Sequence, residues 1–155
     1  MEKTNAVRLL EAAGVAFVLR SYEVDEDDLS AIHAAELLGL DPDSVFKTIV
    51  LEGERTGPFV CVIPGPCEVD LKKATRAAGD KAAHPLPLKE LEPLTGYVRG
   101  GCSPLGLKRK LPVFIDETAL VFDSISVSAG RRGLQVLISP RDLADAAGAE
   151  FRNLV

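Results

Sequence analysis

Apolar residues recur at helical spacing in five segments of the chain, and most of these segments follow a residue that caps helices well. A short polar side chain satisfies free backbone N–H groups at a helix start, and a glycine after the last turn can adopt the left-handed conformation that ends a helix. The pattern therefore predicts five helices: from Thr4 or Asn5 to Gly14, from Ser30 to Gly39, from Asp70 to Gly79, over residues 88–94, and after Ser139-Pro140.

Shorter runs rich in Val, Ile, Phe and Leu, bounded by glycine, proline and polar residues, predict β-strands. We expect strands over residues 15–22, 45–51, 59–63, 97–99, 113–116, 120–122, 125–128 and 134–138. The polar connection over residues 53–57 is typical of a hairpin between the second and third. Because strands and helices do not alternate regularly, we expect a mixed α/β fold. Its strongly curved, barrel-like, mostly antiparallel or mixed sheet would have about seven strands flanked by helices.

Composition indicates one domain over residues 1–155. The chain is 46% hydrophobic and 26% charged, with a formal net charge of −5. A chain of about 150 residues can build one hydrophobic core, and no apolar run here reaches the roughly 18 to 20 residues that span a bilayer. The first residues also lack the basic flank and apolar stretch of a secretory signal. We therefore expect a cytoplasmic protein that does not enter a membrane.

Cysteine and histidine usage argues against several kinds of site. The three cysteines, Cys61, Cys67 and Cys102, are an odd number in a chain that needs no disulfide framework, so we expect free thiols. Their spacing to each other and to the two histidines matches no familiar metal-ligand pattern, and no Gly-x-Ser-x-Gly signature is present. The sequence thus predicts no metal and no cofactor, and it disfavours a catalytic-triad hydrolase.

Charge is distributed unevenly along the chain. Residues 21–54 contain ten acidic residues and one basic residue, whereas residues 72–110 contain nine basic and three acidic residues. Two clusters in the second segment, Lys72-Lys73-x-x-Arg76 and Lys108-Arg109-Lys110, could bind phosphates. An ordinary solvated face explains them equally well.

The one basic residue of the acidic segment, Lys47, lies inside the predicted strand over residues 45–51. By strand alternation its side chain points with Val45, Ile49 and Leu51. An ammonium group among apolar neighbours is costly unless it is paired or lines a wet pocket, so Lys47 is a candidate site residue. A lysine that protects an edge strand from aggregation is the alternative.

Two glycine-containing segments are candidate binding loops. Residues 96–106 contain the pair Gly100-Gly101, and residues 126–133 contain Gly130 between two predicted strands. Glycine allows the backbone to approach a ligand closely and to present N–H groups to an anion or a polarised carbonyl. A tight connection is the simpler explanation for each loop taken alone.

Four segments, in order along the chain, resemble the YbaK family of aminoacyl-tRNA deacylases, which are related to the editing domain inserted in bacterial prolyl-tRNA synthetases. They are Val45-Phe46-Lys47-Thr48, the stretch over residues 95–101, Ser103-Pro104-Leu105-Gly106 followed by Lys108, and the stretch over residues 127–134. The resemblance covers nearly the whole chain. It is greatest to the branch described as Cys-tRNA(Pro)/Cys-tRNA(Cys) deacylases, whose openings resemble residues 3–8 and 28–31.

The resemblance implies removal of cysteine from tRNA, chiefly from Cys-tRNA(Pro) and also from Cys-tRNA(Cys). Cysteine and proline have similar volumes, and an apolar pocket separates substrates by only about 1 to 3 kcal/mol per methylene-sized difference, so a second site must supply the missing fidelity. In the family, the thiol of the substrate cysteine is proposed to attack its own ester and release a cyclic thiolactone. A well-positioned intramolecular nucleophile can gain roughly 7 to 11 kcal/mol, so no protein nucleophile is needed.

The same resemblance implies roles for particular residues. Lys47 would be the essential lysine that holds the acyl-adenosine end and stabilises negative charge, and Gly100 and Gly101 would let that end approach the backbone. The remaining substrate-binding residues that it implies are Tyr22, Ser103, Ser128, Gly130 and Asp142. No role is carried over to Cys102, and the variable segment over residues 25–32 leaves the preferred amino acid open.

Alternatives to this function stay open at the level of sequence. The substrate could be Ala-tRNA(Pro) or another small misacylated residue, or the protein could be a noncatalytic module that binds tRNA or a synthetase. A thiol-redox protein is a more distant alternative because no Cys-x-x-Cys motif occurs. The implied partners are the 3′ end of aminoacyl-tRNA and prolyl-tRNA synthetase, and the implied state is a monomer.

Overall fold

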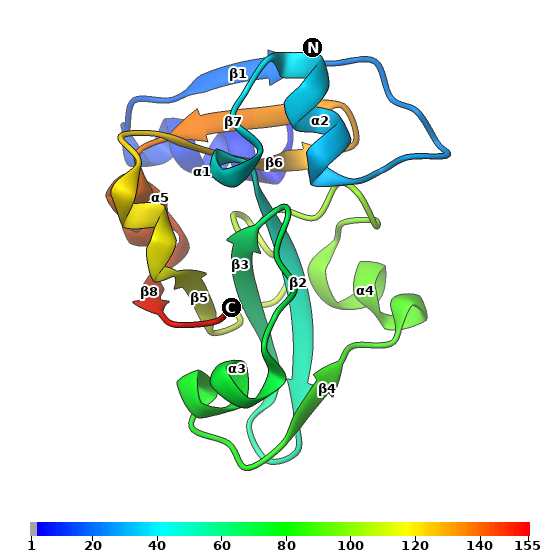
Figure 1. Cartoon of the computed structure of the whole chain (residues 1–155), viewed down its shortest axis with the longest axis vertical. Coiled ribbons are helices and arrows are strands. Elements are labelled where there is room, and N and C mark those ends of the chain that lie inside the picture. The colour runs from blue at the N-terminus through cyan, green and yellow to red at the C-terminus, as the bar shows by residue number, and fades with distance from the viewer. Residues whose placement is uncertain (1–2) are drawn as a thin grey trace.

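The computed structural model describes residues 3–155, whose strands form two sheets (Figure 1). In chain order the strands are β1 (Val18–Ser21), β2 (Phe46–Gly53), β3 (Gly57–Pro64), β4 (Ala83–Pro85), β5 (Val113–Asp116), β6 (Ile125–Arg131), β7 (Leu134–Ile138) and β8 (Ala149–Arg152). The smaller sheet is antiparallel, in the order β1-β7-β6. The larger sheet has the order β4-β2-β3-β5-β8, and β5 pairs in parallel with both β3 and β8. The predicted mixed α/β class is confirmed.

The predicted barrel-like sheet is wrong. The two sheets are joined by one isolated bridge, between Val45 and Ser126, so the strands do not close around a common axis. Two predicted strands are also absent from the described part of the chain. Residues 97–99 form an irregular loop held by the Tyr97 hydroxyl, which donates to the Leu105 carbonyl at 2.6 Å. The segment Glu117–Val121 is a 3₁₀ helix, and the Asp116 carboxylate caps its start by accepting from the Thr118 N–H.

The five predicted helices are confirmed, and local signals start and end them. They are α1 (Asn5–Ala13), α2 (Ala31–Leu38), α3 (Leu71–Ala78), α4 (Leu88–Thr95) and α5 (Pro140–Ala147). The Ser30 side chain accepts from the His33 N–H at the start of α2, and the Asp70 carboxylate accepts from the Lys73 N–H at the start of α3. Both helices end at a glycine in the left-handed conformation.

The residues of β2 alternate between two hydrophobic clusters. Leu51 packs with Phe59 and with Ala74 of α3 on one face of the larger sheet, and Ile49 lies at the edge of that cluster. Val50 and Phe46 belong to the larger cluster on the other face, together with Val127 and Val136 of the smaller sheet. The Lys47 side chain therefore emerges on the α3 side of the sheet, as the alternation predicted.

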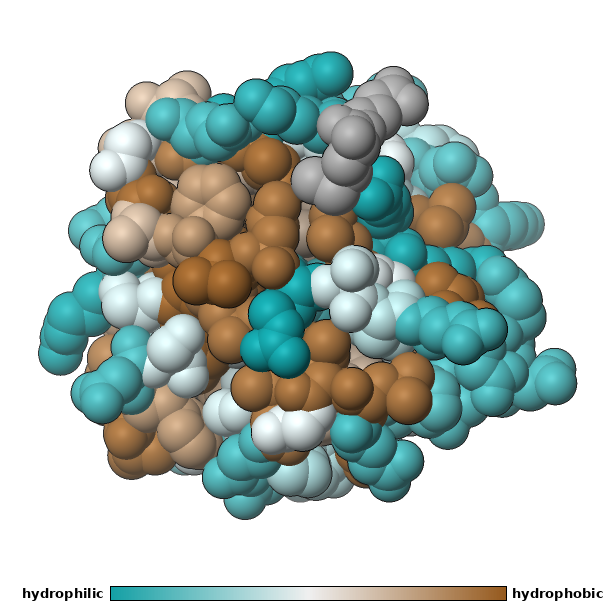
Figure 2. Space-filling view, turned by 90° about the horizontal axis from the view of Figure 1, so that it is seen from above, coloured by the Kyte–Doolittle hydropathy of each residue, from teal (hydrophilic) through white to brown (hydrophobic). Residues whose placement is uncertain are grey.

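Apolar surface is visible at the end of the molecule that carries β1 and α2 (Figure 2). The exposed large apolar side chains of these two elements are Val18, Ile32 and Leu37. None of the helices within residues 3–155 is both long enough and apolar enough to cross a bilayer.

Asp80 ties the β2–β3 turn to the connection between α3 and β4. Its carboxylate accepts from the Arg55 and Thr56 N–H groups at 2.9 and 2.8 Å, from the Thr56 hydroxyl, and from the Lys81 N–H. These hydrogen bonds favour the ionised form, so they lower the pKa of Asp80 below its usual range.

A pH-dependent contribution to stability follows from Asp80. Because its pKa is lower in the folded state, its stabilising effect is present above the unfolded pKa of about 3.9 and is lost as pH falls below that value. We expect Asp80→Asn to lower the urea midpoint of unfolding at pH 7. Below pH 4 the midpoint of this variant should fall less with pH than the midpoint of wild type. Urea titrations across this pH range measure the effect. The control is Asp27→Asn, since the Asp27 side chain makes no hydrogen bond within residues 3–155; an equal change in the control would contradict the assignment.

Candidate functional site

A pocket of about 290 Å³ lies at the open edge of β2. β4 pairs only with the end of β2, from Leu51 onward, so among the described residues no strand pairs with residues 47–49 on that side. The walls come from β2, α2, the segment before α2, the smaller sheet and the loop over residues 96–106 that contains Gly100 and Gly101, here called the double-glycine loop. The lining residues are Tyr22, Leu29, Ser30, Ala31, Ala34, Phe46, Lys47, Thr48, Ile49, Gly65, Arg99, Gly100, Cys102, Ser128 and Gln135.

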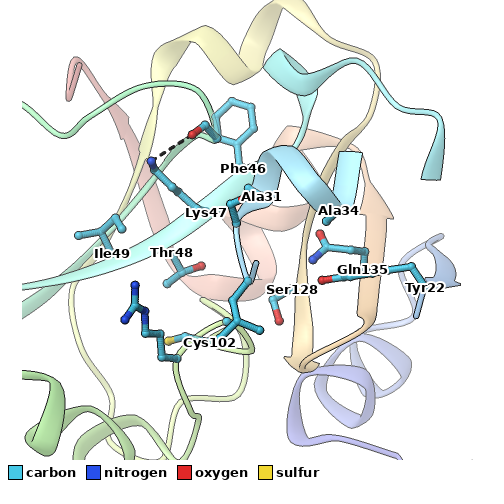
Figure 3. A pocket seen from close by; sticks show the side chains of 15 residues that line it. Tyr22, Ala31, Ala34, Phe46, Lys47, Thr48, Ile49, Cys102, Ser128 and Gln135 are labelled. Atoms are coloured by element: carbon cyan, nitrogen blue, oxygen red, sulfur yellow. Dashed lines mark hydrogen bonds between the residues drawn. The ribbon is translucent and has the colours of Figure 1, made fainter. Parts of the chain in front are cut away.

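Lys47 places a cation at one side of this pocket (Figure 3). Its Nζ donates to the Gly65 carbonyl at 3.0 Å, which orients the side chain but leaves two further N–H donors. Within the described chain no carboxylate lies at ion-pair distance from this amine. The half-buried ammonium is therefore available to a negatively charged or polarised oxygen in the pocket.

Thr48 lines the pocket beside Lys47, with its side chain on the opposite face of β2 (Figure 3). Its Oγ1 is buried, and it is the only buried side-chain oxygen or nitrogen in the described residues without a hydrogen-bond partner. The Val45 carbonyl accepts from Gly65 on the β3 side, whereas the Val50 carbonyl accepts from Leu86 on the opposite side. By the same alternation, the backbone N–H and C=O of Thr48 face the open edge.

The two adjacent glycines have different surroundings. Gly100 lines the pocket with φ of +84°, and a Cβ there would lie 3.1 Å from the Leu29 Cβ. Gly101 does not line the pocket; a Cβ on it would lie 2.9 Å from the Arg131 and Arg132 backbone. Gly100 therefore forms part of the pocket wall, while Gly101 allows the loop to pack against the β6–β7 turn.

Arg132 connects three segments of the chain next to the pocket wall at Gly100. Its Nε donates to the Arg99 carbonyl at 2.8 Å, directly before the double glycine, and its guanidinium pairs with Glu26 at 2.8 Å. Glu26 belongs to the segment that leads to Leu29 and Ser30 in the pocket wall. Arg132 thus holds the segment around Glu26 next to the double-glycine loop.

Of the other residues predicted from the sequence, Tyr22 and Ser128 also line the pocket. Ser103, Gly130 and Asp142 do not. The Ser103 hydroxyl is fully buried and accepts from the Leu105 N–H at 3.2 Å, and a Cβ on Gly130 would lie 2.9 Å from the Tyr97 ring. Asp142 lies in the first turn of α5, where its N–H donates to the Ser139 hydroxyl.

Gln135 and Cys102 are pocket residues that the sequence reasoning did not select, as is Thr48. Gln135 is 6% exposed, and its Oε1 accepts from the Ser126 hydroxyl at 2.7 Å. A glutamine within the apolar strand β7 and a threonine within the apolar strand β2 were visible signals, because a polar side chain on a buried strand needs a partner. Figure 3 shows that their side chains come to the same pocket from different strands.

The chemical groups in the pocket are cations and neutral hydrogen-bonding groups. Lys47 and Arg99 supply positive charge, and the lining residues include no histidine, aspartate or glutamate. Burial raises the pKa of the Cys102 thiol to about 11, so that thiol is protonated at neutral pH. The pocket can therefore bind an anion and stabilise a developing oxyanion, but it offers no side chain suited to act as a general base at pH 7.

Replacing Cys102 tests whether the thiol in the pocket wall takes part in chemistry. Since a protonated thiol is a poor nucleophile, we expect Cys102→Ala to keep pocket activity within about threefold of wild type. Initial rates of the reaction that the pocket catalyses measure this effect. The matched control is Cys61→Ala, which removes a buried thiol outside the pocket. A loss of a hundredfold or more confined to Cys102→Ala would assign the thiol a chemical role.

Comparison with known families identifies the kind of protein to which this pocket belongs. The model described as "Aminoacyl-tRNA editing domain" matches residues 26–146, which contain most of the pocket wall. The chain belongs to this family. The resemblance seen in the four sequence motifs is thereby confirmed, and the structure of this editing domain brings Lys47, Gly100 and Ser128 of those motifs to one pocket.

Individual relatives agree with the family. The editing domain is 43% identical over 153 residues to the "Putative Cys-tRNA(Pro)/Cys-tRNA(Cys) deacylase EbsC" of Enterococcus faecalis, across 99% of this chain and 93% of the relative. A solved "putative trans-editing enzyme for prolyl tRNA synthetase" superposes with a TM-score of 0.83 at 27% identity, covering 99% and 98% of the two chains. The hypothetical protein APE2540 shares the fold, with a TM-score of 0.88 at 24% identity over 97% and 99% of the chains.

Proposed function

We propose that this protein is a trans-editing deacylase that removes cysteine from Cys-tRNA(Pro), and that the thiol of the substrate is the nucleophile. The observation that carries the proposal is the chemistry of the pocket, whose lining provides Lys47 and Arg99 but no imidazole or carboxylate. A hydrolytic water would need a base, whereas a thiol is already a few per cent thiolate at pH 7. A cysteine substrate therefore supplies the group that the pocket lacks.

The step balances without a protein nucleophile. The substrate sulfur attacks the ester carbonyl carbon, the carbonyl oxygen gains negative charge, and the bond to the ribose oxygen breaks. The ribose oxygen takes up the proton that the thiol has lost, which gives a cyclic thiolactone and tRNA with a free hydroxyl. The protein contributes orientation of the reacting atoms and stabilisation of the oxyanion.

We assign to Lys47 the binding of negative charge on the substrate. Two N–H donors of its ammonium remain after the hydrogen bond to the Gly65 carbonyl, and no carboxylate within residues 3–155 forms an ion pair with it. It would hold a phosphate or ester oxygen of the terminal adenosine and stabilise the developing oxyanion. The wall at Gly100 would let that adenosine lie close to the backbone, and Tyr22 and Ser128 would contact it from other parts of the lining.

We assign to Thr48 a hydrogen bond to the aminoacyl part of the substrate. A buried hydroxyl without a partner carries a desolvation penalty of about 1 to 3 kcal/mol, which a substrate hydrogen bond would remove. The α-amino group of the substrate could donate to Oγ1, and the backbone groups of Thr48 face the same open edge.

The function is tested by single-turnover deacylation of a set of substrates. We expect purified protein to cleave Cys-tRNA(Pro) and to leave Pro-tRNA(Pro) intact. Faster cleavage of Ala-tRNA(Pro) than of Cys-tRNA(Pro) would transfer the activity to another small residue, and tRNA binding without cleavage of any ester would indicate a noncatalytic module.

We place this activity in the cytoplasm, where aminoacyl-tRNAs are made, and expect the protein to act as a monomer. Selection of tRNA(Pro) would be shared with prolyl-tRNA synthetase, since the fold resembles a trans-editing enzyme for that synthetase. Adding the synthetase should then increase discrimination between Cys-tRNA(Pro) and Cys-tRNA(Cys).

A further inference from the structure

A second groove lies along α3 and the connection that leads to β4, apart from the pocket at β2. Its lining contains three cationic side chains, Lys72 and Arg76 of α3 and Lys81 of the following connection. All three residues are exposed. The groove shares no lining residue with the pocket, so its charge needs a separate explanation.

The acidic groups at this groove, including Asp80 in its lining, accept hydrogen bonds from other parts of the chain. Asp70 caps α3, and Asp80 accepts hydrogen bonds from the β2–β3 turn and from the Lys81 N–H. Lys81 pairs with Glu54 at 3.6 Å. In the described part of the chain Lys72 and Arg76 form no ion pair, so two cations are left for an external anion.

The groove and Lys47 lie on the same side of the larger sheet. α3 packs over Leu51 on the face from which the Lys47 side chain emerges, and β4 pairs with the end of β2 at residues 51–53. The strand between Lys47 and Gly53 spans about 20 Å. A ligand whose end enters the pocket and whose body continues along this face would reach Lys72 and Arg76 of α3.

We propose that the α3–β4 groove binds the phosphate backbone of the tRNA acceptor arm while the aminoacylated 3′ end occupies the pocket. This inference rests on the proposed function and adds a binding surface to it. RNA helices are recognised largely through shape and through phosphate and ribose contacts, for which exposed lysine and arginine side chains are suited. The groove contributes affinity for the body of the tRNA and none for the amino acid.

The test compares two substrates and two double variants with equal charge change. One variant is Lys72→Glu with Arg76→Glu. The control is Lys89→Glu with Arg141→Glu, two exposed residues of α4 and α5 that line neither the pocket nor this groove. One substrate is Cys-tRNA(Pro), and the other is a cysteine ester of the trinucleotide CCA, which lacks the helix of the acceptor arm.

For the α3 variant we expect KM for Cys-tRNA(Pro) to rise about tenfold. The slope of log(kcat/KM) against the logarithm of the salt concentration should become less steep by about two, because two phosphate contacts are lost. Its kcat and its rate on the CCA ester should equal those of wild type, and the control should change neither substrate. Equal KM values for wild type and the α3 variant, or an equal effect of the control, would overturn the proposal. If wild type cleaves neither ester, the proposed function fails, and filter binding of uncharged tRNA by the same variants still tests the groove.

Discussion

Lys47→Ala is expected to lower kcat/KM for Cys-tRNA(Pro) by about 10²- to 10³-fold, the range seen when a single oxyanion-stabilising donor is removed. The reason is that Lys47 is the pocket ammonium with no carboxylate partner among residues 3–155, so no other residue of β2 can replace its charge. Lys47→Arg should recover only part of the rate, since a planar guanidinium differs in shape and reach from an ammonium.

Single-turnover rates and thermal unfolding of the same samples measure this effect. Lys110→Ala serves as the control, because it removes an exposed lysine that does not line the pocket. Equal rates for wild type and Lys47→Ala would remove Lys47 from the site. A large loss of thermal stability in Lys47→Ala would assign the rate effect to folding, and Lys47→Met, which keeps most of the apolar stem, distinguishes the two.

Thr48→Val is expected to lower kcat/KM by about 10- to 100-fold while leaving the protein as stable as wild type or more stable. The two effects have opposite signs for one physical reason. The hydroxyl is buried without a partner in the free protein, so its removal costs nothing there, but a hydrogen bond to the substrate is lost. Such a pair of effects distinguishes a substrate-binding group from a structural one.

Thr48→Ser is the matched variant, since it keeps the hydroxyl and removes only a methyl group. We expect its activity to stay within about threefold of wild type, because the substrate hydrogen bond is preserved. Chemical denaturation and initial rates of the three proteins provide the two readouts. Full activity in Thr48→Val, or a stability loss equal to its activity loss, would contradict the assignment.

Local signals in the sequence predicted the helices well, because a cap acts within one turn. Ser30, Asp70 and Ser139 all cap the helices that the sequence assigned to them. The short strands β4 and β8 were missed, since strands of three and four residues are specified by the neighbours with which they pair. The barrel was wrong for the same reason: pairing partners, and not strand positions, decide whether a sheet closes.

The candidate site shows the same limit. Lys47 could be selected because an ammonium inside an apolar strand is unusual at any position. Thr48 and Gln135 are ordinary polar residues in β2 and β7, and only the arrangement of the two sheets brings them to one pocket. Gly101 was proposed to contact the substrate, and the structure instead packs it against the backbone of the β6–β7 turn.

The ratio of deacylation rates for Cys-tRNA(Pro) and Ser-tRNA(Pro) tests the central claim most directly. The two side chains differ in the atom that would attack, and a serine hydroxyl is a far weaker nucleophile than a thiol without an adjacent base. A pocket lined by no imidazole or carboxylate should therefore cleave the cysteine ester at least about 100-fold faster. Comparable rates for the two esters would show that water attacks, and would contradict the account.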